Sequence, residues 1–511
     1  MENVELLMHG FGIALSLNHI GLMLLGVLMG LVVGVLPGLG APNGVSLLLP
    51  LTFGMPPVSA IILLSSMYWG ALFGGSVTSI LFNIPGEPSS VATTFDGYPM
   101  ARDGRPTTAL ATAFSSAAFG ALVGVVLITL LASWIARRAL EFGPPEYFAV
   151  YFLAFASFVG VGGAKPIKTV VSLCLGFAIA AIGMDTVSGT VRLTMGVDAF
   201  VSGISFVVAV MGLFGVGELL IACEEEIHAK GVSSKVEWRE VWRTLARMPS
   251  HWVALLRSAL VGCWMGITPG GPTAASFMSY GLAKRLSPRR ANFGKGEPEG
   301  VVSPETADHA AGTSALLPML ALGIPGSATA AVMMGGLMIW GLNPGPMLFV
   351  DQKDFVWGLI ASMYLGNIVA VVMVLLTVPV FAALMRVPFF IISPIILIIC
   401  AVGAYAEANR YIDVVLMMGF GVLGYFFKKL DYPISPLVLA MVIGNRAEDA
   451  FRQSMLVSKG GVGIFFETPL CATITGLGIA LLVLPLLGHG LRRLSARARR
   501  GPDAKGASAA P

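Results

Sequence analysis

Long apolar stretches follow one another along the whole chain, and only short polar segments separate them. Val58 to Phe82, Val201 to Ala222 and Val356 to Leu384 are examples, and each matches the roughly 20 residues that cross the hydrocarbon core of a bilayer. The pattern predicts an all-α polytopic membrane protein with about twelve transmembrane helices. Apolar segments too short to cross alone, such as Val45 to Phe53, predict additional broken or re-entrant half-helices.

Four Pro-Gly dipeptides interrupt these stretches in an ordered way. GVLPGLGAPNG begins at Gly34 and GITPGGPTAAS at Gly266, 232 residues later (266 − 34). Each is followed by an Ile-Pro-Gly segment, NIPGEPSS in the first half of the chain and GIPGSATA in the second. The same order in both halves indicates two copies of one membrane unit. The prolines that mark the four breaks are Pro37, Pro85, Pro269 and Pro325.

Basic residues are distributed in opposite ways around equivalent breaks. The loop TFGMPP after the first half-helix has no Lys or Arg, whereas its counterpart KRLSPRR has four. Near the second break the contrast is reversed, because DGYPMARDGRP, interpreted as a loop, carries two arginines before its final proline and its counterpart GLMIWGLNPGP carries none. Lys and Arg collect on the cytoplasmic side, so the copies are predicted to be inverted repeats, with the loops at Gly54 and Leu286 on opposite sides of the membrane.

These patterns divide the chain into four regions. Residues 1–222 form the first membrane repeat and residues 251–490 the second, with a polar inter-repeat segment at 223–250 and a basic tail at 491–511 that is predicted to be disordered on the cytoplasmic face. In the inter-repeat segment, Trp238 and Trp242 stand among alternating charges, which predicts an amphipathic helix on the membrane surface. Docking of a partner is the alternative role for this helix.

Composition supports this fold class and excludes a soluble domain. Hydrophobic residues make up 56% of the chain and charged residues 12%, which is about half the charged share of a soluble domain. The basic excess behind the net charge of +4 lies largely in the C-terminal tail, and no nucleic-acid partner is expected. Five scattered cysteines lack a Cys-x-x-Cys spacing and a nearby histidine, so neither a metal site nor a bound cofactor is predicted.

The breaks supply the chemistry from which a binding site is predicted. A break leaves N–H groups unpaired at the start of the following helix, where the dipole favours a carboxylate, and carbonyls unpaired at the end of the preceding helix, where a cation fits. No Lys or Arg falls between Gly34 and Gly86 or between Val261 and Gly281, so an anion held there must rely on N–H and hydroxyl groups. The predicted substrate-binding residues are Gly38, Gly40, Asn43, Gly86, Ser89, Ser90, Gly270, Gly271, Thr273, Gly326, Ser327 and Thr329.

A cation coupled to transport is expected to use polar residues at the same breaks. The candidates are Asn83, Glu87, Thr268 and Asp308. Glu87 has the alternative of complementing the dipole of its own helix, and Asp308 with His309 has the alternative of a loop position in water. The breaks themselves have the alternative of being packing kinks, because neighbouring helices can satisfy the backbone groups that Pro and Gly free.

The substrate-binding hypothesis gives the break glycines a role that mutation can test. Replacing Gly86 or Gly326 by Val should abolish transport while the protein stays folded, because glycine lets a ligand approach the backbone closely. The same change at a packing glycine such as Gly124 should be milder.

Several longer segments resemble a known family. GVLPGLG, LLLPLTFGMPP, GGSVTSILFNIPGEPSSVATTFDGYPMARDGR, MGLFGVGE and LLPMLALGIPGSATAAVMMGGL are similar to segments of the large membrane subunit of the bacterial tripartite tricarboxylate transporters, the TctA family. The resemblance extends from about Gly26 to Leu487. Asp308 and His309 depart from it, because Asn residues are usual there, and Pro272 stands where a small residue would follow the second Gly.

The resemblance implies a multi-pass secondary transporter of the bacterial inner membrane. It would import carboxylate-bearing organic anions, either a tricarboxylate such as citrate or a related di- or aromatic carboxylate, by symport with Na⁺ or H⁺. It implies two partners, a small membrane subunit and a periplasmic solute-binding protein. A channel or an intramembrane enzyme is the rival, but no Ser-His or Asp-Asp arrangement lies within a span, so the chain is not expected to be an enzyme.

Overall fold

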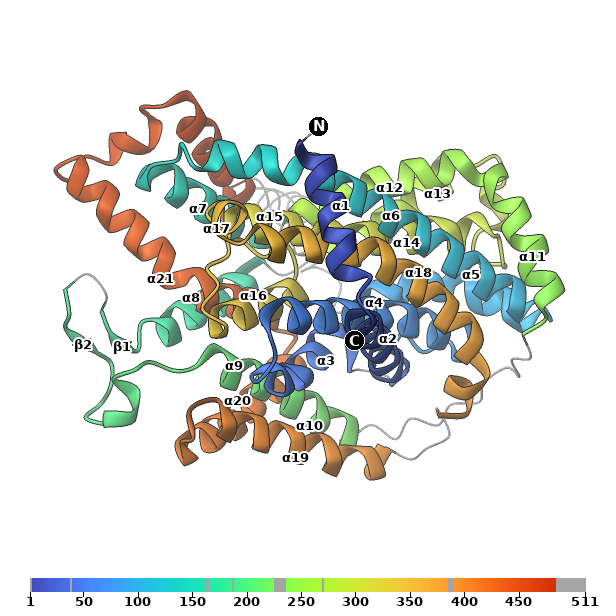
Figure 1. Ribbon diagram of the computed structural model, residues 1–511, viewed down its shortest axis with the longest axis horizontal. Helices are drawn as coiled ribbons and strands as arrows, with labels where there is room; N and C mark the ends of the chain where they lie inside the picture. The colour runs from blue at the N-terminus through green and yellow to red at the C-terminus, as the bar shows by residue number, and fades with distance from the viewer. Residues whose placement is uncertain are drawn as a thin grey trace, which may run out of the picture.

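The structure, a computed structural model, describes residues 2–36, 39–161, 166–185, 188–224, 236–268, 271–384 and 389–483. Nearly all of this part of the chain is helical (Figure 1). The described helices that are long and apolar enough to cross a membrane are Leu17–Val35, Pro57–Phe82, Pro106–Ala139, Phe206–Glu224, Lys353–Val380 and Tyr411–Lys429. The predicted all-α polytopic membrane fold is confirmed, whereas the number of about twelve crossings stays a prediction. Pro37, Gly38, Pro269, Gly270 and the predicted tail at 491–511 lie outside the described residues.

The first repeat is built from helices with clear start signals. The Ser16 hydroxyl accepts a hydrogen bond from His19 N (3.3 Å) at the start of α2. Pro57 and Pro106 begin α4 and α6, where a missing N–H leaves no helical hydrogen bond unmade. The elements are α1 (Glu2–Ala14), α2 (Leu17–Val35), α3 (Gly40–Leu48), η1 (Leu49–Thr52), α4 (Pro57–Phe82), η2 (Pro88–Ser90), α5 (Val91–Arg102) and α6 (Pro106–Ala139).

A small hairpin separates the next helices. The elements are α7 (Pro144–Val161), α8 (Pro166–Ala180), β1 (Gly183–Met184), β2 (Val191–Arg192), η3 (Asp198–Phe200) and the continuous helix formed by α9 (Phe206–Val210), η4 (Met211–Val216) and α10 (Gly217–Glu224). β1 and β2 are antiparallel, with Gly183 opposite Arg192. The span expected to start at Val201 starts instead at Phe206, because a 3-10 turn and Gly203, with φ of 78°, hold the preceding chain in a loop.

The second half repeats the order of a helix, a half-helix and a broken helix. Its elements are α11 (Trp238–Arg247), η5 (Met248–His251), α12 (Trp252–Ile267), α13 (Gly271–Leu286), η6 (Arg290–Asn292), α14 (Glu299–Ser314), α15 (Leu316–Leu322), α16 (Ala328–Ile339), α17 (Leu348–Asp351), α18 (Lys353–Leu384), α19 (Phe389–Ala408), α20 (Tyr411–Lys429), α21 (Ile434–Val457), η7 (Val462–Phe466) and the helix Pro469–Val483. The short apolar segment from Ile434 to Ile443 is therefore the first part of a helix that continues to Val457.

The two repeats have the same backbone geometry at their second breaks. α4 ends at Asn83 and α15 ends at Gly323, both in the left-handed conformation, with φ of 58° and 70°. In each repeat the following isoleucine N–H donates to the carbonyl six residues before it, at 3.4 Å in the first and 3.2 Å in the second. The two residues are 240 positions apart (323 − 83), which is also the separation of Pro85 and Pro325. Equivalent residues of the two repeats therefore make the same backbone hydrogen bond, as the duplication inferred from the Pro-Gly pattern predicts.

Glycines on α2 and α12 allow equivalent close packing of backbones. Gly34 lies against the carbonyl of Ala71 in α4, and Gly266 lies against the carbonyl of Ala311 in α14. A Cβ at either glycine would overlap that carbonyl, so no larger residue fits without a shift of the helices. Gly266 follows Gly34 by 232 residues, and Ala311 follows Ala71 by 240 (311 − 71). The helix before the first break therefore packs on the broken helix in the same way in both repeats.

Elements of one repeat pack on the breaks of the other. α3 contacts α16, and α13 contacts η2, so each half-helix reaches the second break of the opposite repeat. α6 lies along α14, and α18 lies along α4 (Figure 1). The long helix of each repeat thus covers the broken helix of the other. The half-helices α3 and α13 and the two second breaks are consequently brought together.

A buried carboxylate joins the repeats at the start of α6. Asp96, fully buried on α5, accepts four hydrogen bonds at Oδ1 from the N–H groups of residues 294–297, at 2.8 to 3.1 Å, and one at Oδ2 from the Tyr280 hydroxyl at 2.9 Å. The interpretation of DGYPMARDGR as a loop is wrong, because α5 continues through Pro99 to Arg102. These tertiary hydrogen bonds outweigh the local turn signals of Asp, Gly and Pro.

The loops at Gly54 and Leu286 lie at opposite ends of α6. The loop after Leu286 returns to the start of α6, where Gly296 lies beside Arg105. Gly54 precedes α4, whose first turn packs beside the start of α18, and that start lies by the C-terminal end of α6. In Figure 1, α5 and α11 lie at the right, and β1, β2 and α21 at the left. Inverted repeats require this arrangement, and placement on opposite sides of a membrane stays a prediction.

The inter-repeat segment contains the predicted helix. α11 exposes Trp238 and Trp242, buries Val241 and packs on α6. A helix with one charged face and exposed tryptophans fits a membrane surface, but its position relative to a membrane stays a prediction. Residues 225–235 of this segment lie outside the described residues.

Candidate functional site

Three carboxyl side chains are buried near the breaks. Glu305 and Asp308 lie on α14 and Glu87 lies at the second break, and all three are at most 8% exposed. Asp308 lies close enough to Glu87 and Glu305 for the three carboxylates to repel one another electrostatically. Among the described residues no Lys or Arg pairs with them, and the nearest ion-pair partner is His309, whose Nδ1 is 3.9 Å from Glu305 Oε2. A buried carboxylate without a counter-charge is costly, so this region favours a bound proton or cation.

Hydroxyl groups of the first repeat hold the Glu305 carboxyl of the second. Ser76 Oγ donates to Glu305 Oε2 at 2.7 Å, and Thr93 Oγ1 donates to Oε1 at 2.5 Å. His309, one turn further along α14, packs against Phe73 with ring centroids 4.6 Å apart and ring planes tilted by 52°. Its Nε2 has no hydrogen-bond partner in the described part of the chain. The acid is therefore fixed by neutral donors, which leave its charge uncompensated.

Glu87 connects two breaks of the first repeat. Its Oε1 accepts a hydrogen bond from Ala41 N, in the first turn of α3, at 2.5 Å. Its own N–H donates to Ser90 Oγ at 3.2 Å. Glu87 thus complements the half-helix of the first break, and it is also the N-cap of its own helix, in a capping box with Ser90. This contact also shows how the N-terminus of a half-helix receives a carboxylate.

Tyr68, on α4, joins the second breaks of both repeats. Its hydroxyl lies near the side chains of Ser327 and Thr329, and the charges of Glu87 and Asp308 act on it. Its hydroxyl also lies against Gly312 of α14, where a Cβ would be 2.8 Å away. The centre of the protein therefore combines three acids with three hydroxyl-bearing side chains from opposite repeats.

Besides His309 Nε2, two further polar atoms in this centre lack hydrogen-bond partners among the described residues. They are Ser89 Oγ and Asp308 Oδ1, and the two side chains lie next to each other. Both residues are at least nine-tenths buried, so water does not obviously satisfy them. Such a pair is suited to a small ion or proton that joins the acid to the break.

The predicted residues fall into two groups. Glu87, Ser89, Asp308, Ser327 and Thr329 meet around Tyr68. The loop alternative for Asp308 and His309 is wrong, because both are buried on α14.

The other predicted residues have local structural contacts. Asn83 is the left-handed C-cap of α4, and Thr268 Oγ1 donates to Met265 O at 2.9 Å at the end of α12. Ser90 Oγ accepts from Ser79 Oγ at 3.0 Å. Gly40 and Asn43 lie on α3, Gly271 and Thr273 on the first turn of α13, and Pro85, Gly86, Pro325 and Gly326 in the non-helical breaks. Their binding roles stay predictions.

Sequence reasoning missed Tyr68, Glu305, Ser76 and Thr93. Glu305 had a signal, because Glu305 and Asp308 are three residues apart and share a face if the segment is helical. The many polar residues of the segment around Glu305 instead favoured a loop. Tyr68 had no signal, because it lies inside an apolar stretch and only the approach of the second repeat gives its hydroxyl a role.

The break glycines have a packing contact that the binding hypothesis did not consider. A Cβ at Gly86 would overlap the carbonyl of Gly34, and a Cβ at Gly326 would overlap that of Gly266. Valine there would displace backbone, so the valine test does not separate packing from binding. Gly124 is also an unsuitable mild control, because a Cβ there would lie 2.9 Å from Thr313 Cβ.

Comparison with known proteins adds a family model and two relatives. The model of the tripartite tricarboxylate transporter TctA family matches residues 20–439. An uncharacterized 52.8 kDa protein in the TAR-I ttuC' 3' region of Agrobacterium vitis is 35% identical over 488 residues, which cover 95% of this chain and 97% of that protein. An uncharacterized protein in the TAR-II ttuC' 3' region of the same organism is 35% identical over 227 residues, which cover 44% of this chain and 94% of that protein. No solved structure matches the chain.

Proposed function

The chain belongs to the tripartite tricarboxylate transporter TctA family, and from this membership we propose that it is the large membrane subunit of a secondary transporter that imports carboxylate-bearing organic anions by cation symport. It is a multi-pass membrane protein of a transporter family. The bacterial inner membrane is its proposed location.

The observation that supports symport is the acidic centre at the breaks. Glu87, Glu305 and Asp308 are buried together, and the described residues provide no Lys or Arg to neutralise them. An acid in such a place is stabilised by a bound proton or cation. When the proton or cation is released, the buried negative charge raises the free energy of the protein. The centre therefore acts as the coupling site, and either H⁺ or Na⁺ fits this role.

The substrate carboxylates are assigned to the half-helix N-termini. The Ala41 N–H already holds one carboxylate, that of Glu87, and the N-cap hydroxyl of Ser327 accepts from Ala330 N at 3.1 Å. A substrate carboxylate competes for such donors while the cation neutralises the nearby acids. The coupling is electrostatic, because each ligand lowers the cost of holding the other in a medium of low dielectric.

Two partner proteins complete the proposed transporter. They are a small membrane subunit and a periplasmic solute-binding protein. The ends of the described helices carry short connections rather than a separate soluble domain that could capture a dilute solute. Substrate delivery is therefore assigned to the binding protein.

Uptake by reconstituted vesicles tests this function. Vesicles with the complete three-part transporter are given labelled citrate, succinate or phthalate, under a Na⁺ gradient, a pH gradient or no gradient. One of these acids should accumulate above its external concentration, only with a cation gradient and only with the binding protein present. Gradient-independent equilibration would indicate a channel, and full uptake by this chain alone would contradict the role of the partners.

A further inference from the structure

We propose that the cavity between α7 and α21 is a receiving site for the substrate carboxylate and that Arg446 is its anion-binding side chain. This inference rests on the proposed function, because it concerns the anion that the transporter imports. It differs from the sequence-based site, which uses no basic side chain. Arg446 lies on α21, in the same end of the molecule as β1 and β2.

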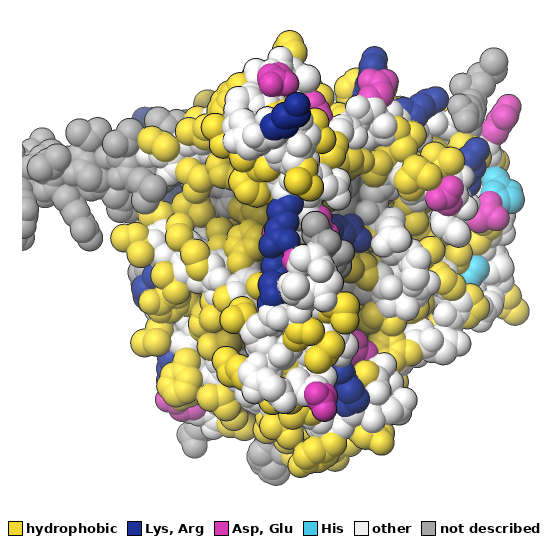
Figure 2. Space-filling model, turned by 90° about the vertical axis from the view of Figure 1, so that its left-hand side faces the viewer, with side chains coloured by type: hydrophobic (Ala, Val, Ile, Leu, Met, Phe, Trp, Pro, Cys, Tyr) yellow, Lys and Arg dark blue, Asp and Glu magenta, His cyan; other side chains and the backbone are white. Residues whose placement is uncertain are grey.

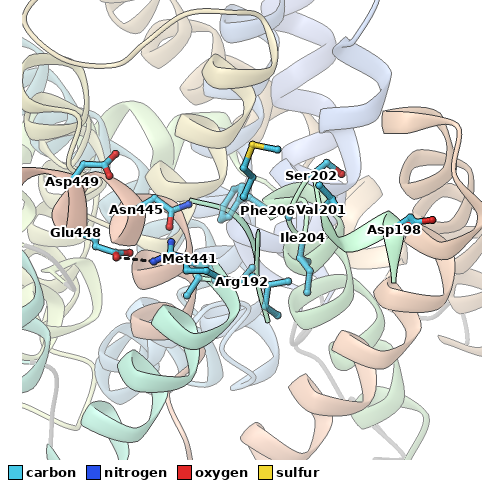
Figure 3. A pocket seen from close by; sticks show the side chains of 15 residues that line it. Arg192, Asp198, Val201, Ser202, Ile204, Phe206, Met441, Asn445, Glu448 and Asp449 are labelled. Carbon is cyan, nitrogen blue, oxygen red and sulfur yellow. Dashed lines mark hydrogen bonds and ion pairs between the residues drawn. The ribbon is translucent and has the colours of Figure 1, made fainter. Parts of the chain in front are cut away.

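The bonding of Arg446 differs from that of the neighbouring arginines. Arg192 Nη1 lies 2.8 Å from Glu448 Oε1, a pair that Figure 3 draws with a dashed line. Arg452 lies 2.8 Å from Asp185 Oδ2 and 2.5 Å from Glu448 Oε1. Both guanidinium groups are therefore held by carboxylates of the protein.

Arg446 instead donates to neutral oxygens. Its Nη1 lies 3.4 Å from Pro344 O and its Nη2 lies 3.4 Å from Asn343 Oδ1. These distances are longer than the roughly 2.7 to 2.9 Å of strong charge-assisted hydrogen bonds. A carboxylate would offer the planar guanidinium two charged acceptors in place of two distant neutral ones.

The cavity beside Arg446 is wide open to the surface, and its size and lining suit the first contact with a small organic acid. Its volume is about 420 Å³, within the range of roughly 300 to 1,000 Å³ for small-molecule sites. Tyr147 and Tyr151 stack along one wall with ring centroids 6.4 Å apart, and the Tyr151 hydroxyl lies within reach of the Arg446 charge. The lining residues are Phe142, Pro144, Tyr147, Tyr151, Arg446, Asp449, Ala450 and Gln453.

The cavity wall carries one basic and one acidic side chain, Arg446 and Asp449, so the preference for an anion rests on the long hydrogen bonds of Arg446 and not on a net charge. Asp449 is the acid on the cavity wall, and Arg452, one turn further along α21, acts on it electrostatically. Figure 2 shows this end of the molecule, where Lys and Arg side chains form a row in the middle of a largely apolar and uncharged face. An anion that approaches the face is drawn toward that row.

Arg446 also lies beside a break, which connects the cavity to the centre. A Cβ on Gly323, the residue that ends α15, would be 3.2 Å from Arg446 Nη1. The chain runs from Gly323 through three residues to Ser327, whose side chain lies near Tyr68. A carboxylate on Arg446 is therefore placed at the outer edge of the break whose inner edge reaches the acidic centre.

Uptake kinetics of Arg446 variants test the site. The complete transporter is assayed with whichever of citrate, succinate and phthalate it accumulates. Arg446→Gln should raise the half-saturating concentration at least tenfold, with a change of less than threefold in the maximal rate. Arg446→Lys, which keeps the charge and loses the fork, should raise it about threefold. Arg138→Gln is the control, because Arg138 is an exposed arginine near the same end and pairs with Glu141 at 3.4 Å, and its half-saturating concentration should stay within twofold of the wild type.

A labelling measurement separates binding from folding. Gln453→Cys places a thiol on the exposed rim of the cavity, in a background without the native cysteines. The transported acid should protect this thiol from a maleimide when residue 446 is Arg, and should not when it is Gln. A wild type that transports while Arg446→Gln keeps the same half-saturating concentration and the same protection overturns the Arg446 site alone. Absence of uptake of all three acids overturns the proposed function, and this site with it.

Discussion

α4 and α14 occupy equivalent places in the two repeats and carry different chemistry. Both are buried, and both present a backbone carbonyl to a glycine of the preceding helix, at Ala71 in α4 and Ala311 in α14. At the position where α4 has Tyr68, α14 has Asp308, 240 residues later (308 − 68). Where α4 has Ser65, α14 has Glu305. The repeats therefore share the packing of their backbones and not the polar groups that the backbones position.

This difference indicates how a duplicated fold provides one asymmetric site. The second repeat supplies two of the three central acids, and the first supplies the hydroxyls that hold Glu305, together with Tyr68. If α4 carried the same two acids as α14, five acids would meet in the centre, at a much higher electrostatic cost. Shared packing should respond equally to mutation in both repeats, whereas the chemistry should not.

The largest effect is expected at the acid of the unequal pair. Glu305→Gln should lower the initial rate of gradient-driven uptake about 1000-fold, to the background of empty vesicles, which corresponds to about 4 kcal/mol in a barrier. Exchange of labelled for unlabelled substrate should persist, because the half-helix N-termini are unchanged. Ser65→Ala, at the equivalent position, should reduce this rate less than tenfold. Comparable losses in the two variants would contradict the unequal roles of α4 and α14.

The next largest effect is expected at Asp96, which joins the repeats and has no equivalent acid in the second repeat. Asp96→Ala should lower the free energy of unfolding by at least about 3 kcal/mol, because four buried N–H groups and one hydroxyl lose their acceptor. Thermal unfolding of the purified protein in detergent measures it. The equivalent residue of the second repeat is Gly336 (96 + 240), where a Cβ would meet only flexible side-chain ends within 4 Å, so Gly336→Ala should change stability much less.

A smaller and equal effect is expected at the shared packing. Gly34→Ala and Gly266→Ala should each lower the free energy of unfolding by about 2 kcal/mol, because each Cβ meets a backbone carbonyl that cannot move alone. Gly419 of α20 is the control, because no atom lies within 4 Å of its Cβ position, and Ala there should be neutral or stabilising. If only one of the two repeat variants were destabilised, the common packing would not be a common energetic feature.

The smallest perturbation tests orientation. Single cysteines at Gly54 and Leu286, both in exposed positions, should differ in reaction with an impermeant maleimide applied outside the cell, with Gly54 labelled and Leu286 protected. The exposed native cysteines Cys174 and Cys223 must be replaced first. Equal labelling of both positions would rule out inverted repeats.

The sequence alone determined the membrane class, the four breaks and the duplication. These features depend on local properties, because apolar length decides which segments enter a bilayer and Pro-Gly decides where a helix stops. The constant spacing then revealed the repeat without knowledge of any contact. Glu87 and Asp308 were also recognisable, because acids are rare beside apolar spans and therefore conspicuous.

Only the tertiary structure decided which groups meet. The polar segment around Glu305 predicts a loop, but in the fold it is a helix buried by its neighbours. Tyr68 stands out only in the fold, where Ser327 of the other repeat lies near its hydroxyl. Asp96 is a turn signal in sequence and a helix residue in the fold, because its acceptors are used by backbone N–H groups about 200 positions away. Arg446 reaches Gly323 from α21, 123 residues later (446 − 323). The free-energy cost of burying a charge or a polar group depends on its neighbours in space, and the local sequence does not determine those neighbours.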